Sequence, residues 1–165
     1  MNLIIGTANI SAIFAIFHDG VIERYVSNQG NLYLTVDISY LAQLVQPGYC
    51  SFHVALHDVA DVTFATWPKS AQAHPSVLTS LADIFIPALS LLSGEPDGNA
   101  IKVICNQPAR DSLHCGGELR FRAWSACVTD AAGKQYALAE LEELSRTYWD
   151  AWKERNGNRG DANPS

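Results

Sequence analysis

Three stretches in the first half of the chain alternate between apolar and polar residues. The alternation is strictest at Leu32–Ile38, and it recurs at Tyr49–Leu56 and Val59–Trp67. A period of two places every second side chain on one face, so each stretch predicts a strand with one buried face. Turn residues at 28–31 precede the first stretch, and Pro68 ends the last one. We therefore expect these strands to form a β-meander.

The segment before these strands allows two structures. Asp19-Gly20 separates the apolar run Ala12–Phe17 from Val21–Ser27. An Asp-Gly pair in such a place predicts a β-hairpin, because both residues can adopt positive φ. The same apolar run also suits a short helix over Ile10–Phe17 that ends near Gly20. Both structures stay open for this segment.

Helical spacing returns after the third strand. A short helical turn is expected at Tyr40–Val45, and a longer middle helix is expected to begin after Ser76, which is a suitable N-cap. Pro87 should kink or end this middle helix. Its apolar residues are Val77, Leu81, Ile84, Phe85 and Ala88.

Strands and turns are expected again after the middle helix. Gly94–Gly98 has the composition of a turn, and Ala100–Cys105 that of a short strand. Gly117–Thr129 predicts one longer strand. The turn residues at 130–134 then form a hairpin, and the chain returns through Gln135–Leu138.

The last element is the clearest helix. Leu141, Leu144, Tyr148 and Trp152 follow one another at steps of three and four, so they line one face. We expect Tyr148 and Trp152 to lie in the core. Trp149 lies off that stripe, where an exposed Trp can anchor a partner. The alternative for Trp149 is that it covers an edge of the sheet.

These elements define an α+β fold, a mainly antiparallel sheet of meanders and hairpins with a C-terminal amphipathic helix packed on it. The chain has 165 residues, which is the usual size of one domain. We expect a single globular domain at 1–156 and a flexible polar tail at 157–165. Hydrophobic residues make up 48% and charged residues 17%, which excludes an intrinsically disordered chain.

The charge excludes one class of partner and is compatible with another. The formal net charge is -6 and the pI about 5.2, so the chain lacks the basic balance of a nucleic-acid binder. Residues 1–100 hold eight acids and two bases, a balance of -6, whereas residues 101–165 hold nine of each. An acidic face can steer a basic partner protein, although the same charge also serves ordinary solubility.

Cysteine usage points to a reducing compartment. The four cysteines form no C-x-x-C pair, and a chain of this length does not need disulfides. The apolar stretch Leu3–Phe17 is interrupted by polar residues, is too short to span a bilayer and follows no basic residue. We expect a cytoplasmic protein without a membrane segment. Where that stretch is not all core, it could supply the interface of a homo-oligomer.

Two His-Asp pairs are the strongest candidates for a polar site. His18-Asp19 and His57-Asp58 each stand where a strand is expected to end. If these strands are neighbours, the four side chains gather at one rim of the sheet. They would then form a small-molecule or metal site in a concave pocket, with perturbed pKa values. The alternative is structural, because a turn accounts for Asp19-Gly20 without any function.

Other clusters give weaker grounds for a metal. His53 and His57 are four residues apart, which on a strand is about 13 Å, too far for one ion whose ligand bonds are about 2 Å long. Cys105, His114 and Cys115 lack an obvious fourth ligand. Nucleotide-binding, zinc-protease and serine-hydrolase motifs are also missing. We therefore favour a protein without a metal, a cofactor or catalytic residues.

Several short motifs resemble a known group of proteins. The motifs are Phe17–Ile22 with the Asn-Gly-rich turn that follows it, the alternating segment Leu32–Ile38, and Leu141–Leu144 with Tyr148–Asp150. They resemble small uncharacterised bacterial domains, some of which are grouped with immunity proteins of polymorphic toxin systems. The resemblance implies a β-rich fold with a packed C-terminal helix, a partner-binding role and no catalysis.

Two hypotheses about function follow. The resemblance extends over residues 15–68 and 117–152, and it favours a non-catalytic interaction module that binds another protein, such as a toxin that it neutralises. The second hypothesis is a small-molecule or metal-binding protein, or an enzyme, whose site is the rim with the two His-Asp pairs. The two differ in a simple way: the rim site requires that both pairs converge.

Overall fold

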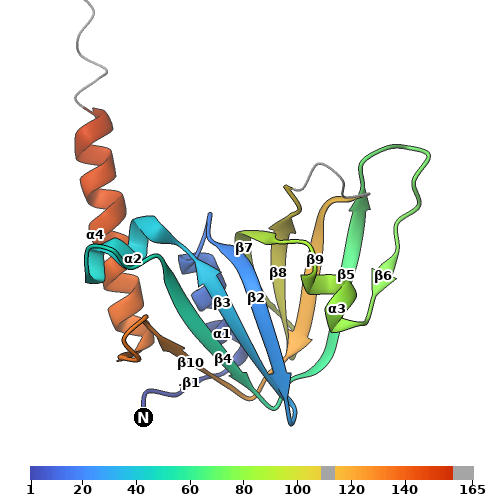
Figure 1. Ribbon diagram of the computed structural model, residues 1–165, viewed down its shortest axis with the longest axis horizontal. Coiled ribbons are helices and arrows are strands. Elements are labelled where there is room, and N and C mark those ends of the chain that lie inside the picture. Colours follow the sequence, from blue (N-terminus) through green and yellow to red (C-terminus); the bar gives the residue numbers. More distant parts are fainter. Residues whose placement is uncertain (109–113, 158–165) are drawn as a thin grey trace, which may run out of the picture.

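The computed structural model describes residues 1–108 and 114–157. This part of the chain folds into one antiparallel sheet of eleven strands with four helices, which confirms the predicted α+β class (Figure 1). The strands are β1 (Ile4–Ile5), β2 (Val21–Asn28), β3 (Asn31–Asp37), β4 (Ser51–His57), β5 (Ala60–Pro68), β6 (Val77–Leu78), β7 (Leu89–Asp97), β8 (Ala100–Asn106), β9 (His114–Arg122), β10 (Ser125–Thr129) and β11 (Gln135–Tyr136). The helices are α1 (Thr7–Ile16), α2 (Ser39–Val45), α3 (Leu81–Phe85) and α4 (Leu138–Gly157).

The sheet divides into two arms that meet at β2 and β7. The strand order is β1-β10-β4-β3-β2-β7-β8-β9-β5-β6, and β11 pairs with β10. Strands β2 and β7 pair at only two positions, Val21 with Ser90 and Ile22 with Leu89. We call β10, β4, β3 and β2 the first arm, and β7, β8, β9 and β5 the second arm. Figure 1 shows the first arm on the left and the second on the right.

The three alternating stretches form strands as predicted. They are β3, β4 and β5, and in each of them the buried side chains alternate with more exposed ones. The meander is correct for β2, β3 and β4, which are neighbours in this order. It fails at β5, because β5 pairs with β9 and β6 on the far side of the sheet.

Helix α1 decides the open choice between helix and hairpin. The hairpin predicted around Asp19-Gly20 is wrong. Asp19 adopts φ 67°, and the Gly20 N–H donates to the Phe17 carbonyl at 2.8 Å, so the pair ends a helix instead of joining two strands. A helix buried in a core is apolar on most sides and shows no clear stripe in the sequence. The buried residues of α1 are Ile10, Ser11, Ile13 and Phe14.

Helix α1 also joins the two arms into one core. Phe14 meets Phe121 of β9 edge to face, with ring centroids 5.8 Å apart, and Phe17 stacks on Phe52 of β4 at 5.3 Å. The helix lies against β7 and β8. This close approach depends on Gly94, because a Cβ at that position would lie 2.4 Å from a backbone oxygen of α1.

The predicted middle helix is largely wrong. Residues Val77–Leu78 form the edge strand β6, and only α3, which is capped at Ser80, is helical. The cause is a local contact: the Thr66 N–H donates to the Ser76 carbonyl at 2.8 Å, and the Ser76 N–H donates to the Thr66 hydroxyl at 2.9 Å. These bonds hold the chain extended beside β5 where the helix was expected.

Two further boundaries differ from the prediction. Gly94–Asp97 belongs to β7, so the expected turn is confined to Gly98-Asn99. The expected long strand Gly117–Thr129 is divided between β9 and β10, which lie in different arms. The chain crosses from one arm to the other at Trp124, whose N–H donates to the His57 carbonyl at 2.9 Å.

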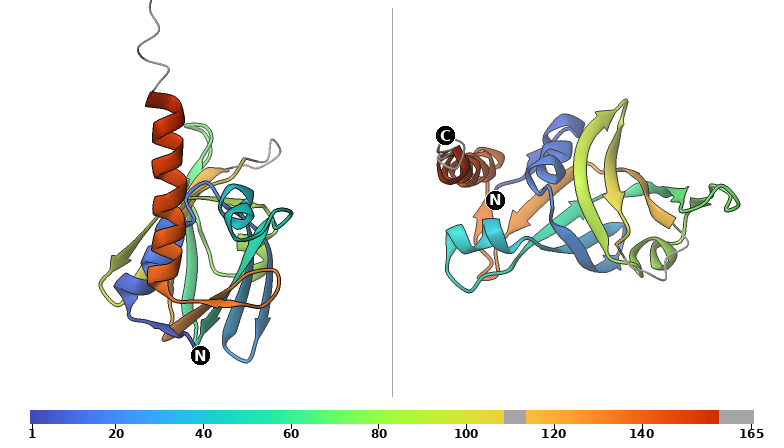
Figure 2. Two further views of the ribbon diagram at one scale, coloured as in Figure 1. Left: turned by 90° about the vertical axis from the view of Figure 1, so that its left-hand side faces the viewer. Right: turned by 90° about the horizontal axis from the view of Figure 1, so that it is seen from above.

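The C-terminal helix α4 is confirmed, and it extends beyond the sheet. It lies against α1 and α2, and Leu141 is its fully buried residue. Every residue from Asp150 to Gly157 is exposed, and Figure 2 shows this end of the helix projecting from the body. Trp152 is 44% exposed, so its expected place in the core is wrong. The expected tail lies, from residue 158 on, outside the described residues.

No helix in the described ranges is long and apolar enough to cross a membrane.

Candidate functional site

The first His-Asp pair lies in the turn after α1. The His18 Nδ1 and the Asp19 Oδ2 are 3.0 Å apart, so the two side chains meet. The turn leads directly into β2, whose first residue Val21 faces Asp37 at the end of β3. The pair therefore lies at the end of the first arm where β2 begins and β3 ends.

The second His-Asp pair lies at the opposite end of the first arm. His57 ends β4, and the Asp58 N–H donates to the Asn31 Oδ1 at 3.2 Å, where β3 begins. The six steps along β3 correspond to about 20 Å. The rim site with all four residues is therefore a wrong prediction. Strands β2 and β4 run in the same direction on either side of β3, so the start of β2 and the end of β4 lie at opposite ends of the arm.

The sequence clusters considered for a metal are also separated. His53 is exposed on β4, and its Nδ1 lies 3.3 Å from the Thr35 hydroxyl. Cys105 points into the core, and burial raises the pKa of its thiol to about 12. Cys115 is exposed instead, and its thiol donates to the Trp67 carbonyl. Within residues 1–108 and 114–157, no group of three His, Cys, Asp or Glu side chains could hold a metal ion.

Trp149 belongs to a cluster that the sequence did not reveal. We call Tyr40, Tyr148, Trp149 and Trp152 the aromatic junction, because they join α2 to α4. The Tyr40 ring centroid lies 4.4 Å from that of Tyr148 and 6.1 Å from that of Trp149. The centroids of Trp149 and Trp152 are 5.9 Å apart. Trp149 is half-buried here, and its neighbours are aromatic side chains of two helices, not a sheet edge.

Tyr40 connects the aromatic junction to the first His-Asp pair. Its hydroxyl donates to the His18 carbonyl at 2.6 Å. Burial, and after it the charge of Asp19 and the neighbouring Tyr148, raise the pKa of Tyr40 to about 12. The phenol therefore stays protonated and keeps this bond at neutral pH. The structure thus brings His18, Asp19 and Trp149 into one region and leaves His57 and Asp58 elsewhere.

Two exposed apolar side chains extend this surface, Trp152 of the aromatic junction itself and Leu44 on α2. Leu44 lies one turn beyond Tyr40 on α2, and Trp152 lies one turn beyond Tyr148 on α4, so each continues the face of its helix. Both are 44% exposed. The signal for this surface was the i, i+4 spacing on both helices, but the pairing of α2 with α4 is a tertiary contact.

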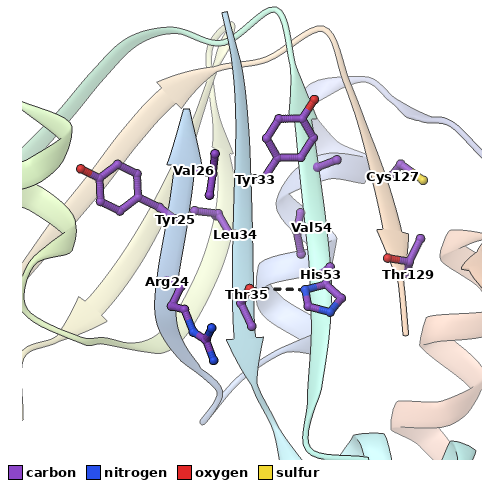
Figure 3. A pocket seen from close by; sticks show the side chains of 11 residues that line it. Arg24, Tyr25, Val26, Tyr33, Leu34, Thr35, His53, Val54, Cys127 and Thr129 are labelled. Atoms are coloured by element: carbon purple, nitrogen blue, oxygen red, sulfur yellow. Dashed lines mark hydrogen bonds between the residues drawn. The ribbon is translucent and has the colours of Figure 1, made fainter. Parts of the chain in front are cut away.

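A second candidate site is a hollow on the outer face of the first arm, which we call the sheet hollow. It has a volume of about 410 Å³. Figure 3 shows most of its side chains in two rows that cross the four strands β2, β3, β4 and β10, with Tyr25, Leu34 and Val54 between the rows. The apolar row is Val26, Tyr33, Ala55 and Cys127, and the polar row is Arg24, Thr35, His53 and Thr129.

The chemistry of the sheet hollow favours binding over catalysis. Cys127 lies on its floor beside Ala55, and burial raises the pKa of the Cys127 thiol, so the thiol is a weak nucleophile. Sequence reasoning missed the hollow. The signal it offered was Tyr33 in a strand whose other outward residues are polar, opposite Val26.

No family model, no curated protein and no solved structure matches the chain.

Proposed function

We propose that the protein is a non-catalytic module that binds a partner protein through the aromatic junction. The observation that carries this proposal is the exposure of Trp152, which extends a packed aromatic cluster on α4. Leu44 is equally exposed on α2, the helix that packs against α4. Tryptophan is the residue type most enriched among interface side chains that dominate binding energy. An aromatic residue that is already held by its neighbours also loses little conformational entropy when a partner covers it.

The shape and charge of α4 favour a partner with an apolar cleft. The exposed residues 150–157 hold two acids and two bases, so their charges balance. Apolar contacts would therefore provide most of the affinity, and the projecting end of α4 would lie in a groove of the partner. His18 and Asp19 at the base of the junction supply a polar edge, which is the usual border of an apolar contact.

The resemblance to immunity domains adds a class of partner to this proposal. Two of the motifs that carry it, Leu141–Leu144 and Tyr148–Asp150, lie on α4, and they suggest a protein toxin as the partner. We keep the cytoplasm as the proposed compartment, because the cysteines Cys50, Cys105, Cys115 and Cys127 are all free thiols.

Replacing Trp152 with Ala tests the proposal. The tagged protein and its variants are expressed in their native cells, the protein they retain is identified, and its affinity is then measured with both purified components. We expect Trp152→Ala to weaken binding by about 30-fold or more, the effect of losing a dominant contact. The matched control is Trp124→Ala, since Trp124 is 59% exposed but lies between β9 and β10. It should bind like the wild type.

Three results would contradict the proposal. A partner that binds Trp152→Ala as tightly as the wild type would use another surface. Equal weakening by Trp124→Ala would indicate a nonspecific apolar contact. A dimer of the purified protein that Trp152→Ala dissociates, measured by light scattering, would mean that a second copy covers the junction instead of a partner.

A further inference from the structure

We infer that the sheet hollow binds a small aromatic monocarboxylate. The inference does not depend on the proposed function, because the hollow lies on the outer face of the first arm and not at the aromatic junction. Three properties of the hollow lead to it: an apolar row of side chains, a polar row beside it, and one arginine without an acidic partner.

The apolar row is unusual for its position. The outer face of an antiparallel sheet is ordinarily polar, since it meets water. Here Val26 is 61% exposed and Tyr33 is 40% exposed, and they face each other directly on β2 and β3. Tyr33 in turn faces Ala55, whose small side chain leaves room above the sheet. The row therefore offers an aromatic ring and methyl groups to a flat apolar ligand.

The polar row lies two residues away from the apolar row on each strand. Arg24 faces Thr35, and Thr35 faces His53. His53 bonds to Thr35 through Nδ1, which leaves its Nε2 as a second polar atom on this face. The row thus combines a permanent positive charge with hydroxyl and imidazole groups that can donate hydrogen bonds.

Arg24 gives the hollow its preference for an anion. Among the described residues it forms no ion pair, and none of the side chains that line the hollow is acidic. A guanidinium binds a carboxylate through two parallel hydrogen bonds, which a single neutral acceptor cannot reproduce. A positive charge in an otherwise neutral hollow, on a chain of net charge -6, therefore selects a negatively charged ligand.

The dimensions of the sheet hollow favour a small ligand. The volume of about 410 Å³ lies within the range of pockets for small molecules. Neighbouring rows on one strand are about 7 Å apart, and four strands span about 14 Å. A carboxylate on Arg24 and an aromatic body over Val26 and Tyr33 match these spacings. A free acid is therefore favoured over a segment of a large partner.

Titration with 2-naphthoate tests the inference. The protein is labelled with ¹⁵N, and amide shifts are followed as the probe is added. We expect saturable shifts confined to β2, β3, β4 and β10, with a dissociation constant of about 1 mM or lower. Naphthalene-2-carboxamide has nearly the same shape without the charge, and it should bind about tenfold more weakly or worse.

Two variants locate the site. Arg24→Gln should weaken the binding of 2-naphthoate by about tenfold to a hundredfold, because the charge-assisted bonds are lost. The matched control is Arg122→Gln on β9, where the arginine is already paired with Asp61; its affinity should stay within about twofold of the wild type. Both arginines are exposed, so both variants should fold, which circular dichroism checks.

Several outcomes would overturn the inference. These are the absence of shifts at 10 mM probe (on the order of ten times the expected constant), equal weakening by the two variants, and equal binding of the acid and the amide. Shifts centred on β8, β9 and β5 would move the site to the second arm and would equally contradict it. None of these results bears on the partner proposed for the aromatic junction.

Discussion

The outer faces of the two arms carry arginines in opposite circumstances. On the second arm, Arg122 holds Asp61 through two nitrogens at 2.6 and 2.7 Å, and Arg120 holds Asp97 at 2.8 Å. On the first arm, Arg24 faces Thr35 and has no acidic partner among the described residues. Both faces belong to antiparallel strands that share one core, so strand geometry alone does not produce the difference.

This difference in pairing indicates which of the two faces can bind an anionic ligand. Exposed ion pairs contribute only about 0 to 1 kcal/mol to stability, so the pairs on the second arm add little to the fold. What they do is neutralise that face. The first arm instead has an arginine that forms no ion pair among the described residues, next to apolar side chains. A carboxylate can bind this arginine without first breaking an ion pair.

The largest loss of stability should come from a substitution at Gly94, because α1 packs against this residue and both arms depend on α1. In Gly94→Val the new Cβ would press on the backbone of α1 and on the Cβ of Phe14. We expect a loss of about 3 kcal/mol or more in the free energy of unfolding, at or above the upper range for overpacked cores. Urea denaturation measures it.

The control for this prediction is Glu95→Val on the same strand. Glu95 is exposed and pairs with Lys102, so its loss should cost less than about 1 kcal/mol. If the two variants were equally stable, α1 would not be held tightly against β7, and the two arms would not share one rigid support.

The next effect should be confined to the first arm, at Asp130. Its Oδ1 accepts hydrogen bonds from the Ala132 and Lys134 N–H groups, and its Oδ2 accepts the Tyr136 hydroxyl at 2.9 Å. Asp130→Ala should cost about 2 to 3 kcal/mol, because it leaves the buried Tyr136 hydroxyl without a partner. Tyr136→Phe removes only one of the three bonds and should cost less than half as much. A larger cost for Tyr136→Phe would contradict this order.

The loss of stability at low pH should depend on the same carboxylate, that of Asp130. Burial alone would raise the pKa of Asp130, but the bonds from Tyr136, Lys134 and Ala132 outweigh burial and lower it below its ordinary value of 3.8. The stabilisation is therefore complete above about pH 4 and is lost as the pH falls through the lowered pKa. In urea titrations below pH 4, the wild type should lose stability faster than Asp130→Ala. Parallel curves would contradict this.

Thr35→Glu should change stability least, and it tests most directly whether the unpaired Arg24 distinguishes the first arm from the second. Thr35→Glu places a carboxylate opposite Arg24 and so gives the first arm the pairing that the second arm has. Stability should change by less than about 1 kcal/mol, but the affinity for 2-naphthoate should fall about tenfold or more. Thr63→Glu is the control, because Thr63 faces Arg120 on the second arm. Calorimetry should show unchanged affinity for this control.

The strands and the last helix could be predicted because their patterns are local. Alternation at β3 and β4 and the three-four spacing on α4 each need only neighbouring residues. Helix α1 could not be distinguished from a strand, because a buried helix such as that of Ile13 and Phe14 is apolar on most sides. The break at Trp124 was hidden because apolar residues continue on both sides of it.

The candidate sites were harder to predict because they depend on which strands are neighbours and in which direction they run. His18 and His57 both follow or end regular elements, yet antiparallel pairing separates them by the length of β3. Tyr40 contacts Trp149 across more than one hundred residues of sequence. The two rows of the sheet hollow come from four strands, and no spacing within one strand shows that Arg24 and Thr129 line the same hollow.

The pairing of β1 with β10 has a consequence for the protein during its synthesis. Ile4 pairs with Ala126, and Ile5 pairs with Ser125. Translation adds about 5 to 20 residues per second, so roughly 6 to 24 s pass between the two strands leaving the ribosome. Throughout that interval β1 has no partner strand, and for most of it the apolar helix α1 lacks β7 and β8, against which it packs. Apolar segments of the nascent chain are therefore exposed until β10 is synthesised, and such exposure favours aggregation during synthesis.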